Sequence, residues 1–329
     1  MLYLHGMGHF YPENIITNKF LEDLDIGTSE EWILERVGIK TRRTILPLDY
    51  IKQTKNANRL EAPRVADYNH SQMGAAAARM ALARASVKLE DIGMLIAGTS
   101  TPDNVAPAEA SIIAAELGIE VPCFDMNSAC STFGMQVNFL SRVRPETFPP
   151  YFLIVDAETM TKTVDYSDRN TAVLFGDGCV AAVVSTSVPS RTVFTSGSYG
   201  SRPSGWNKVG ITNEWLFYQE GNAVQGFAIR TTTEGVKALQ DESAAARRFI
   251  FIGHQANMGV LETVCERTKI LPGNHWYNVD QYGNTASCGA PCVLSQRWDE
   301  IKNGDCIAMS IVGAGLSWAH VLLQAGDDK

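Results

Sequence analysis

Cys123-Phe124-Asp125-Met126-Asn127-Ser128-Ala129-Cys130 is the stretch on which the interpretation of this chain turns, because it ends in a cysteine that two distant motifs are suited to serve. One is His254-Gln255-Ala256-Asn257, which follows the apolar run 249–252 by one glycine. The other is Tyr282-Gly283-Asn284-Thr285-Ala286. A thiol, an imidazole and a carboxamide at strand ends are the groups that form thioesters and stabilise charge on their carbonyl oxygens. The sequence therefore predicts an enzyme with Cys130, His254 and Asn284 as catalytic residues.

Short apolar runs alternate with amphipathic helical patterns on both sides of this stretch. Helices are expected at 72–86, where Ala and Met recur at spacings of three and four, and at 108–117. This alternation predicts an α/β protein with a buried, mostly parallel sheet. The expected strands are 94–97, 151–155, 179–184 and 307–311.

The bulk composition excludes several classes of protein. A chain of 329 residues with 45% hydrophobic and 19% charged residues is typical of a globular protein large enough for two domains or a duplicated fold. The net charge of −8 argues against nucleic acid as a partner. No apolar run reaches the ~18 residues of a membrane helix, and residues 1–10 lack the features of a signal peptide. We therefore expect a cytoplasmic protein without a membrane partner.

The seven cysteines indicate a reducing compartment, because an odd number does not fit a disulfide framework. Cys288 and Cys292 are four residues apart, but no CxxC pair accompanies them and no histidine lies at a ligand-type spacing. The sequence therefore predicts no metal site, and small buried thiols at every cysteine except Cys130.

Three glycine-containing motifs are interpreted mainly as structure. Gly6-Met7-Gly8-His9 lacks the third glycine of a dinucleotide fingerprint and predicts a tight turn after the first strand. Phe175-Gly176-Asp177-Gly178 predicts a turn where backbones approach closely. Residues 313–318, Gly-Ala-Gly-Leu-Ser-Trp, predict a strand-to-turn corner whose backbone N–H groups can cradle an oxyanion.

The polar segment Ile45 to Asn69 interrupts the α/β rhythm and is expected to be a surface loop. Loops of this length within compact domains are often functional.

Taken singly, the polar motifs have ordinary structural explanations. A lone His254 is more often a buried, hydrogen-bonded histidine, and Asn284 in a Gly-Asn-Thr turn is more often a cap of its own backbone. Their joint presence with Cys130 favours catalysis.

The ordered motifs resemble the ketoacyl-acyl-carrier-protein synthase III family of the thiolase fold over nearly the whole chain. Each motif occurs in the order that the family shows, so the resemblance is specific. The motifs are Thr28-Ser29-Glu30-Glu31-Trp32-Ile33, Arg36-Val37-Gly38-Ile39, Arg42-Arg43, Thr101-Pro102-Asp103 with Pro107, Ser128-Ala129-Cys130, Asp168-Arg169, Phe175-Gly176-Asp177-Gly178, His254-Gln255-Ala256-Asn257, Gly283-Asn284-Thr285 and the 313–318 corner.

This resemblance implies a five-layer αβαβα sandwich of two pseudo-duplicated halves, 1–187 and 188–329, in a homodimer. The boundary falls near Val188-Pro189-Ser190. It also implies that Cys130, at the amino terminus of a buried helix whose dipole lowers the thiol pKa, carries the acyl group.

The resemblance further implies that His254 and Asn284 promote decarboxylation of a malonyl thioester and stabilise its enolate, which attacks the acyl-Cys130 carbonyl. The backbone N–H groups of Cys130 and Ala314 would form the oxyanion hole. Trp32 and Arg36 match positions that flank the pantetheine tunnel, and Asn257 a position near its inner end. The substrates would be acyl-CoA or acyl-carrier-protein thioesters, with no separate cofactor.

Two residues depart from the family pattern at expected substrate-binding positions. Lys162 replaces an arginine expected to stack on the CoA adenine against Trp32, and a lysine offers no planar surface for stacking. Ala106 falls near a usually bulky position that closes the acyl pocket across the dimer interface, so a longer or wider pocket is expected.

The expected carrier-protein docking surface and the oxyanion corner also depart from the pattern. Gly226, Gly259 and the pair Glu266-Arg267 stand where basic residues are expected, which removes most of a patch for an acidic carrier protein. Ala314 stands at a usual glycine, where a positive φ would be strained.

These departures favour a specialised relative from secondary or cofactor metabolism over the fatty-acid starter enzyme. The leading interpretation is Claisen-type, decarboxylative condensation. Acyl transfer to oxygen or nitrogen with His254 as general base is an alternative, and a catalytically silent partner subunit is another. Lys52, Lys55, Arg59 and Arg64 in the 45–69 segment could replace the missing docking patch, although a structural role for this segment is about as plausible.

Overall fold

The computed structural model describes residues 1–326 of the chain. Its strands are β1 (Leu2–Phe10), β2 (Asn14–Thr17), β3 (Thr41–Thr44), β4 (Ile92–Gly98), β5 (Cys123–Asp125), β6 (Tyr151–Thr159), β7 (Asp177–Ser185), β8 (Thr192–Ser201), β9 (Val209–Ile211), β10 (Phe217–Gln219), β11 (Arg248–Gly253), β12 (Asp305–Gly313) and β13 (Ser317–Ala325). Its helices are α1 (Asn18–Asp23), α2 (Glu30–Val37), α3 (Leu48–Thr54), α4 (Ala62–Val65), α5 (His70–Ala85), α6 (Glu109–Leu117), α7 (Thr132–Leu140), α8 (Arg169–Ala172), α9 (Gly221–Glu242), α10 (Met258–Thr268), α11 (Val279–Tyr282) and α12 (Gly289–Gln296).

The main sheet is built from two similar strand arrangements placed side by side. The first runs β5-β4-β6-β7-β1, with β4 parallel to β5 and β6 and the remaining pairs antiparallel. The second runs β11-β12-β13-β8, with β11 parallel to β12 and the remaining pairs antiparallel. An isolated parallel bridge from Phe251 to His275 takes the place of β5 at the outer edge of β11. Antiparallel pairing of β1 with β8 joins the two into one sheet of nine strands.

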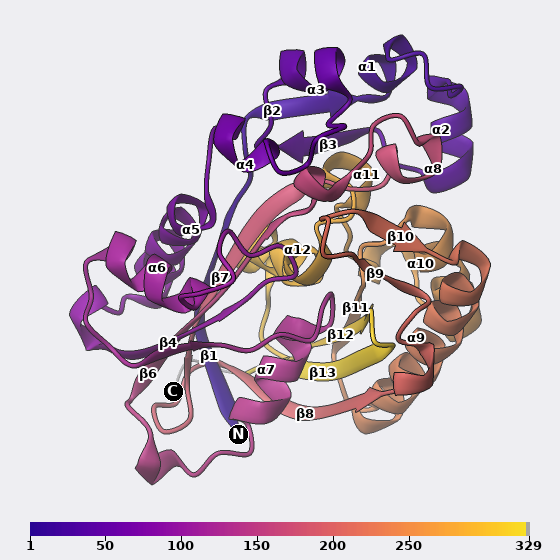
Figure 1. The fold of residues 1–329 in the computed structure, drawn as a ribbon. Coiled ribbons are helices and arrows are strands. Elements are labelled where there is room, and N and C mark those ends of the chain that lie inside the picture. The colour runs from indigo at the N-terminus through magenta and orange to yellow at the C-terminus, as the bar shows by residue number, and fades with distance from the viewer. Residues whose placement is uncertain (327–329) are drawn as a thin grey trace.

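Helices lie in three layers around these strands (Figure 1). Helices α5 and α6 cover the outer face of β1, β4, β5, β6 and β7, and α9 with α10 covers the second arrangement. Between the two arrangements, α7 packs on β8, β12 and β13, whereas α12 packs on β1, β7 and β11. Each central helix thus contacts the strands of the opposite half, which gives the five-layer αβαβα architecture of the thiolase fold.

Strand β6 shows why the sheet is buried on both faces. Phe152 and Ile154 pack into the apolar core around the central helices. Leu153 and Val155, the alternate residues, pack into the core beneath α5 and α6. Because successive side chains point to opposite faces, a strand covered on both sides reads as a continuous apolar run, as this sequence does.

The expected strands and both expected helices are present, but two details of the sequence interpretation are wrong. The sheet is mixed and mainly antiparallel, because each half ends in strands that double back, as β12 does into β13 across a three-residue corner. Gly6 and Gly8 lie within β1 and not in a turn. A Cβ atom on Gly8 would stand 2.0 Å from the Ala77 carbonyl oxygen of α5, so glycine lets the helix approach the strand.

The segment from Ile45 to Asn69 also differs from the expected loop, since it contains α3 and α4. The buried Asn56 side chain donates to the carbonyl oxygens of Lys162 and Val164, both at 2.9 Å. Tyr166 N donates to Lys55 O at 3.0 Å. The segment is therefore anchored to the chain between β6 and β7.

Candidate active site

Cys130 lies in a tight turn between β5 and α7. Ala129 adopts a left-handed conformation with φ of 48°, and its N–H donates to Asn127 Oδ1 at 2.8 Å. Thr132 Oγ1 accepts from Ser128 N at 2.8 Å and donates to Ala129 O at 2.6 Å. Because a non-glycine residue in this conformation costs on the order of 1–2 kcal/mol, these bonds hold a strained turn that presents the thiol before the helix.

Burial, as the largest cause, and the charge of Glu158 together raise the pKa of the Cys130 thiol to about 12, against a lowering by the backbone N–H of Cys130 itself. The expected lowering of this pKa at the amino terminus of α7 is therefore wrong in direction, because loss of hydration is the largest cause of the shift. The resting side chain is a thiol at neutral pH, and its proton must leave as the sulfur attacks.

The β12–β13 corner packs directly against the nucleophile turn. A Cβ atom on Gly313 would stand 3.0 Å from Cys130 N and 2.9 Å from Ser131 N, so only glycine allows this approach. Ser317 Oγ lies 2.8 Å from Ser131 Oγ and ties the corner to the turn. Ala314 follows Gly313 and lines the same cavity as Cys130. Its φ is not positive, so the strain expected at this residue is absent.

His254 directly follows β11, and its backbone N–H donates to Ser310 O of β12 at 2.9 Å. Burial lowers the pKa of His254 to about 4. The imidazole is therefore neutral at pH 7 and can act as a hydrogen-bond donor. Its Nδ1 atom is buried and has no hydrogen-bond partner among residues 1–326.

Asn284 is positioned by its own turn. Gly283, with φ of 68°, brings the chain beside Leu174, whose carbonyl oxygen accepts from Asn284 N at 2.9 Å. Asn284 Oδ1 accepts from Ala286 N at 2.9 Å, so the capping interaction expected of a turn asparagine is present. This bond occupies the oxygen and leaves the Nδ2 group of a cavity-lining side chain as the donor. The capping and catalytic interpretations are thus compatible at this residue.

One cavity of about 1270 Å³ brings these residues together. Cys130, His254 and Asn284 all line it, although they come from three distant segments of the chain. Its apolar wall includes the β9–β10 hairpin through Val209, Ile211 and Phe217. Of the expected substrate-binding residues, Trp32, Arg36 and Asn257 also line the cavity.

Lys162 does not line this cavity, and its assignment beside Trp32 is wrong. Its buried ammonium group forms an ion pair with Asp103 at 2.8 Å and donates to Thr101 O at 3.4 Å. The residue follows β6 in a short 3₁₀ turn, Met160–Thr163, which points the side chain into the α5–α6 side of the sheet. Lysine at this position therefore says nothing about adenine stacking.

Arg169 stands where Lys162 was expected. Its guanidinium carbon lies 5.1 Å from the centre of the Trp32 ring, in a cation–π arrangement, and its Nη1 donates to Gly27 O at 2.7 Å. Arg169 begins α8, and its neighbours Asp168 and Asn170 line the cavity. The Asp168-Arg169 pair was visible in the ordered motifs, but no spacing rule connects it with Trp32 across the fold.

Ala106 is exposed and outside the cavity of this single chain. It lies in the loop between β4 and α6. A role at the acyl pocket requires a second subunit, so this expectation stays a prediction. The cationic residues of the 45–69 segment do not line the cavity either.

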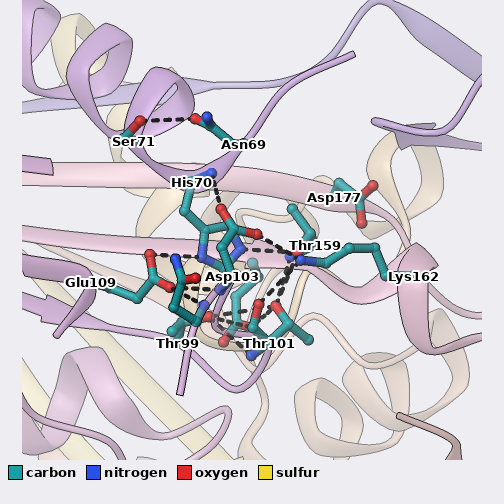
Figure 2. Close-up of polar contacts among 12 residues, drawn as sticks. Asn69, His70, Ser71, Thr99, Thr101, Asp103, Glu109, Thr159, Lys162 and Asp177 are labelled. Atoms are coloured by element: carbon teal, nitrogen blue, oxygen red, sulfur yellow. Dashed lines mark hydrogen bonds and ion pairs between the residues drawn. The ribbon is translucent and has the colours of Figure 1, made fainter. Parts of the chain in front are cut away.

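The side chains of His70, Asp103 and Glu109 form the one cluster within residues 1–326 with a metal-like arrangement, their donor atoms lying within 4.8 Å of one another. Asp103, however, already accepts from Lys162 Nζ at 2.8 Å and from His70 N at 2.7 Å (Figure 2). The lysine ammonium thus supplies the positive charge that a metal would otherwise provide, and the cluster is an ion-paired network.

Among residues 1–326, no helix is both long and apolar enough to cross a membrane.

Comparisons with known proteins agree with the geometry. Residues 124–201 match the family described as 3-oxoacyl-(acyl-carrier-protein) synthase III, and residues 248–325 match the C-terminal part of that enzyme. The chain is 31% identical to beta-ketoacyl-(acyl-carrier-protein) synthase III 2 of Halalkalibacterium halodurans, over 97% of this chain and 95% of the relative.

Solved structures are similar along the whole chain. The 3-oxoacyl-(acyl-carrier-protein) synthase III of Aquifex aeolicus superposes with a TM-score of 0.85 at 28% identity, covering 98% of this chain and 100% of that one. The priming beta-ketosynthase of the R1128 polyketide pathway superposes with a TM-score of 0.85 at 25% identity, covering 100% of this chain and 97% of that one.

Proposed function

The chain belongs to the 3-oxoacyl-(acyl-carrier-protein) synthase III family, and from this membership we propose that it joins an acyl group held on Cys130 to a second thioester. It is a condensing acyltransferase, a ketosynthase of the thiolase fold. The observation that supports the site assignment best is the single cavity lined by Cys130, His254 and Asn284.

In the first half-reaction, the Cys130 sulfur attacks the thioester carbonyl of an acyl-CoA or acyl-carrier protein. A carbon–sulfur bond forms, the leaving thiolate departs, and it takes up the proton that the Cys130 thiol loses. The backbone N–H groups of Cys130 and Ala314 are proposed to stabilise the oxyanion, since Gly313 holds the corner against the nucleophile turn.

In the second half-reaction, a malonyl-type thioester loses CO₂ and becomes an enolate. Neutral His254 and the Nδ2 group of Asn284 are proposed to donate to the enolate oxygen. The enolate carbon attacks acyl-Cys130, the carbon–sulfur bond breaks, and the released thiolate takes one proton from water. Because burial raises the thiol pKa to about 12, this proton is bound firmly at neutral pH.

The neutral state of the His254 imidazole favours condensation over acyl transfer to oxygen or nitrogen. With its pKa lowered to about 4, His254 is a poor general base for an alcohol or amine. Hydrogen-bond donation from a neutral imidazole needs no such basicity. A silent partner subunit is disfavoured because the nucleophile and the cavity are both present.

Trp32, Arg36 and Asn257 are proposed to bind the pantetheine arm, and Arg169, whose guanidinium group lies over the Trp32 ring, is proposed to extend this surface. No metal or cofactor enters this scheme. We also propose that each chain consists of the halves 1–187 and 188–329 and that two chains form a cytoplasmic homodimer, in which Ala106 of one subunit lies near the acyl pocket of the other.

We propose a specialised substrate. Lys162, which lies outside the cavity, and Ala314, whose φ is not positive, do not support it. Support comes from Gly226, Gly259 and Glu266, which leave the expected docking surface for an acidic carrier protein short of basic residues.

The experiment that tests the proposed function supplies a panel of acyl-CoAs together with malonyl-CoA or malonyl-carrier protein and measures CO₂ release and product mass. We expect CO₂ in equal amount to a product with a new carbon–carbon bond. An ester or amide product formed without CO₂ release would instead establish acyl transfer to a heteroatom.

A further inference from the structure

Glu158 of β6 is a buried carboxylate without a role in the scheme above. Its side chain is fully buried, yet it accepts five hydrogen bonds from protein donors. A buried carboxylate costs several kcal/mol in lost hydration unless such donors surround it. The fold therefore builds an anion site for this side chain, within electrostatic reach of Cys130.

One carboxylate oxygen holds the turn of Asn284. Glu158 Oε1 accepts from Ser287 Oγ at 2.6 Å and from Ser287 N at 3.4 Å. Ser287 lies in the 3₁₀ turn Ala286–Cys288, whose first N–H binds Asn284 Oδ1. Oε1 thus fixes the short turn that orients the Asn284 carboxamide towards the cavity.

The other oxygen holds a second part of the cavity wall. Glu158 Oε2 accepts from Ser100 N at 3.0 Å, Thr101 Oγ1 at 3.2 Å and Thr99 Oγ1 at 3.4 Å. Ser100 lines the cavity together with Asn284 and Cys130. A single carboxylate therefore joins two segments of the wall that come from different halves of the chain.

The network around Glu158 continues away from the cavity towards α5 (Figure 2). Thr101 Oγ1 accepts from Thr159 N at 2.9 Å, and Thr159 Oγ1 lies 2.9 Å from His70 Nε2. Burial raises the pKa of Glu158, whereas its hydrogen bonds from Ser287 and Ser100 and its electrostatic interaction with His70 lower it. The titratable groups that interact with Glu158 are His70 on α5, Asp156 on β6, Cys179 on β7, Cys288 beside α12 and Cys130 before α7.

We infer that Glu158 is a positioning residue of the condensation half-reaction, which holds the Asn284 turn against the Thr99–Thr101 turn and places a negative charge within electrostatic reach of Cys130. This inference rests on the proposed function of the same cavity. Acyl loading needs Cys130 and the oxyanion corner, neither of which Glu158 touches through a hydrogen bond. Condensation needs the Asn284 donor, which depends on the turn that Glu158 fixes.

Three variants separate position, charge and general stability. In Glu158→Gln the charge is lost and an amide nitrogen replaces one of the two acceptor oxygens, whereas in Ser287→Ala the carboxylate keeps its charge and loses the 2.6 Å hydrogen bond from Ser287 Oγ in the Asn284 turn. The matched control is Asp177→Asn, because Asp177 is also fully buried and accepts from Thr161 and Ile45, none of which lines the cavity. Each variant is assayed for acyl loading of Cys130, for condensation, and for alkylation of Cys130 by iodoacetamide between pH 7 and 9.

We expect the rate of condensation to fall ~10-fold or more in both Glu158→Gln and Ser287→Ala, at unchanged KM, because the Asn284 donor loses its alignment with the enolate oxygen. Loading should stay within ~3-fold of the parent enzyme. Alkylation of Cys130 should be faster in Glu158→Gln only, because removal of a nearby negative charge favours the thiolate. Asp177→Asn should leave the rates of acyl loading, condensation and Cys130 alkylation as they are in the parent enzyme.

Normal condensation in Ser287→Ala, or the same loss in Asp177→Asn, would overturn the positioning role. If Glu158→Gln does not fold, Ser287→Ala still decides this point. The alkylation comparison does not depend on the overall reaction, and an unchanged rate in Glu158→Gln would contradict the proposed charge effect. A parent enzyme that forms no acyl-Cys130 would refute the proposed function separately.

Discussion

Cys130 and Cys288 stand at matching places in the two halves of the molecule. Each shortly precedes a central helix, α7 in the first half and α12 in the second, and each helix packs on the strands of the opposite half. A helix amino terminus favours a nearby thiolate in both cases. Position in the fold therefore does not distinguish the two cysteines.

Their surroundings differ in access and in hydrogen bonding. Cys130 is half-buried and lines the cavity of about 1270 Å³, beside the Gly313 corner. Cys288 is fully buried, donates to Thr285 O at 3.0 Å, and has a pKa raised well above the ordinary value by burial. The duplicated fold supplies two helix ends, and only the end that opens into a cavity has the features of a nucleophile.

The largest expected effect comes from replacing His254 or Asn284, which share the cavity with Cys130. Replacing His254 or Asn284 by Ala should slow condensation on the order of 10²-fold, because each removes a donor to the enolate oxygen. Loading of Cys130 should largely survive in Asn284→Ala. Single-turnover assays of loading and condensation measure both steps, and Asn284→Ala that condenses normally would point to heteroatom acyl transfer.

The pH dependence of alkylation sharpens the contrast in thiol chemistry. With its pKa raised to about 12, Cys130 is a thiol below that pH, and the reactive thiolate increases as the pH rises. The iodoacetamide rate at Cys130 should therefore climb ~10-fold per pH unit from pH 7 to 9, while Cys288 stays unlabelled in the folded protein. A rate that levels off near pH 7 would mean that the α7 terminus outweighs burial.

Cys288→Ala should affect stability and leave catalysis unchanged. Loss of a buried sulfur and its hydrogen bond to Thr285 O is expected to cost about 1–2 kcal/mol of unfolding free energy. Urea denaturation measures this cost, and the loading assay is the control. Loss of loading in this variant, with the fold intact, would remove the distinction drawn between the two cysteines.

The smallest expected effect concerns the surface and not the cavity. Reversing Lys52, Lys55 and Arg59 to Glu should raise KM for a carrier-bound substrate ~3-fold and flatten its salt dependence, if these cations steer an anionic partner. Steady-state kinetics at several salt concentrations test this, with a CoA-bound substrate as control. Unchanged KM together with loss of the dimer would assign the segment a structural role.

Sequence motifs were sufficient to predict the architecture and the three cavity residues. The strand ends at Cys130 and His254 are local signals, and the order of motifs connects them with Asn284. Apolar periodicity did not distinguish parallel from antiparallel pairing, because a strand covered on both faces has the same pattern in either case. The spacing of Gly6 and Gly8 predicts a turn, whereas both residues lie in β1, since close packing of a helix on a strand leaves no local signature in the sequence.

The pairing of charged side chains could not be predicted from the sequence. Lys162 and Arg169 are seven positions apart, and only the short turn after β6 sends the first towards Asp103 and leaves the second beside Trp32. The direction of the Cys130 pKa shift depends on burial and on Glu158, which are properties of the assembled core. Local reasoning from the helix end gave the opposite direction.

Mass spectrometry of the intact and digested protein after incubation with acyl-CoAs tests the central claim most directly. We predict one acyl group per chain, on the peptide that contains Cys130, with none on the peptide that contains Cys288, and no acylation of Cys130→Ala under the same conditions. An acyl group on any other residue, or unchanged acylation and turnover in Cys130→Ala, would contradict the account.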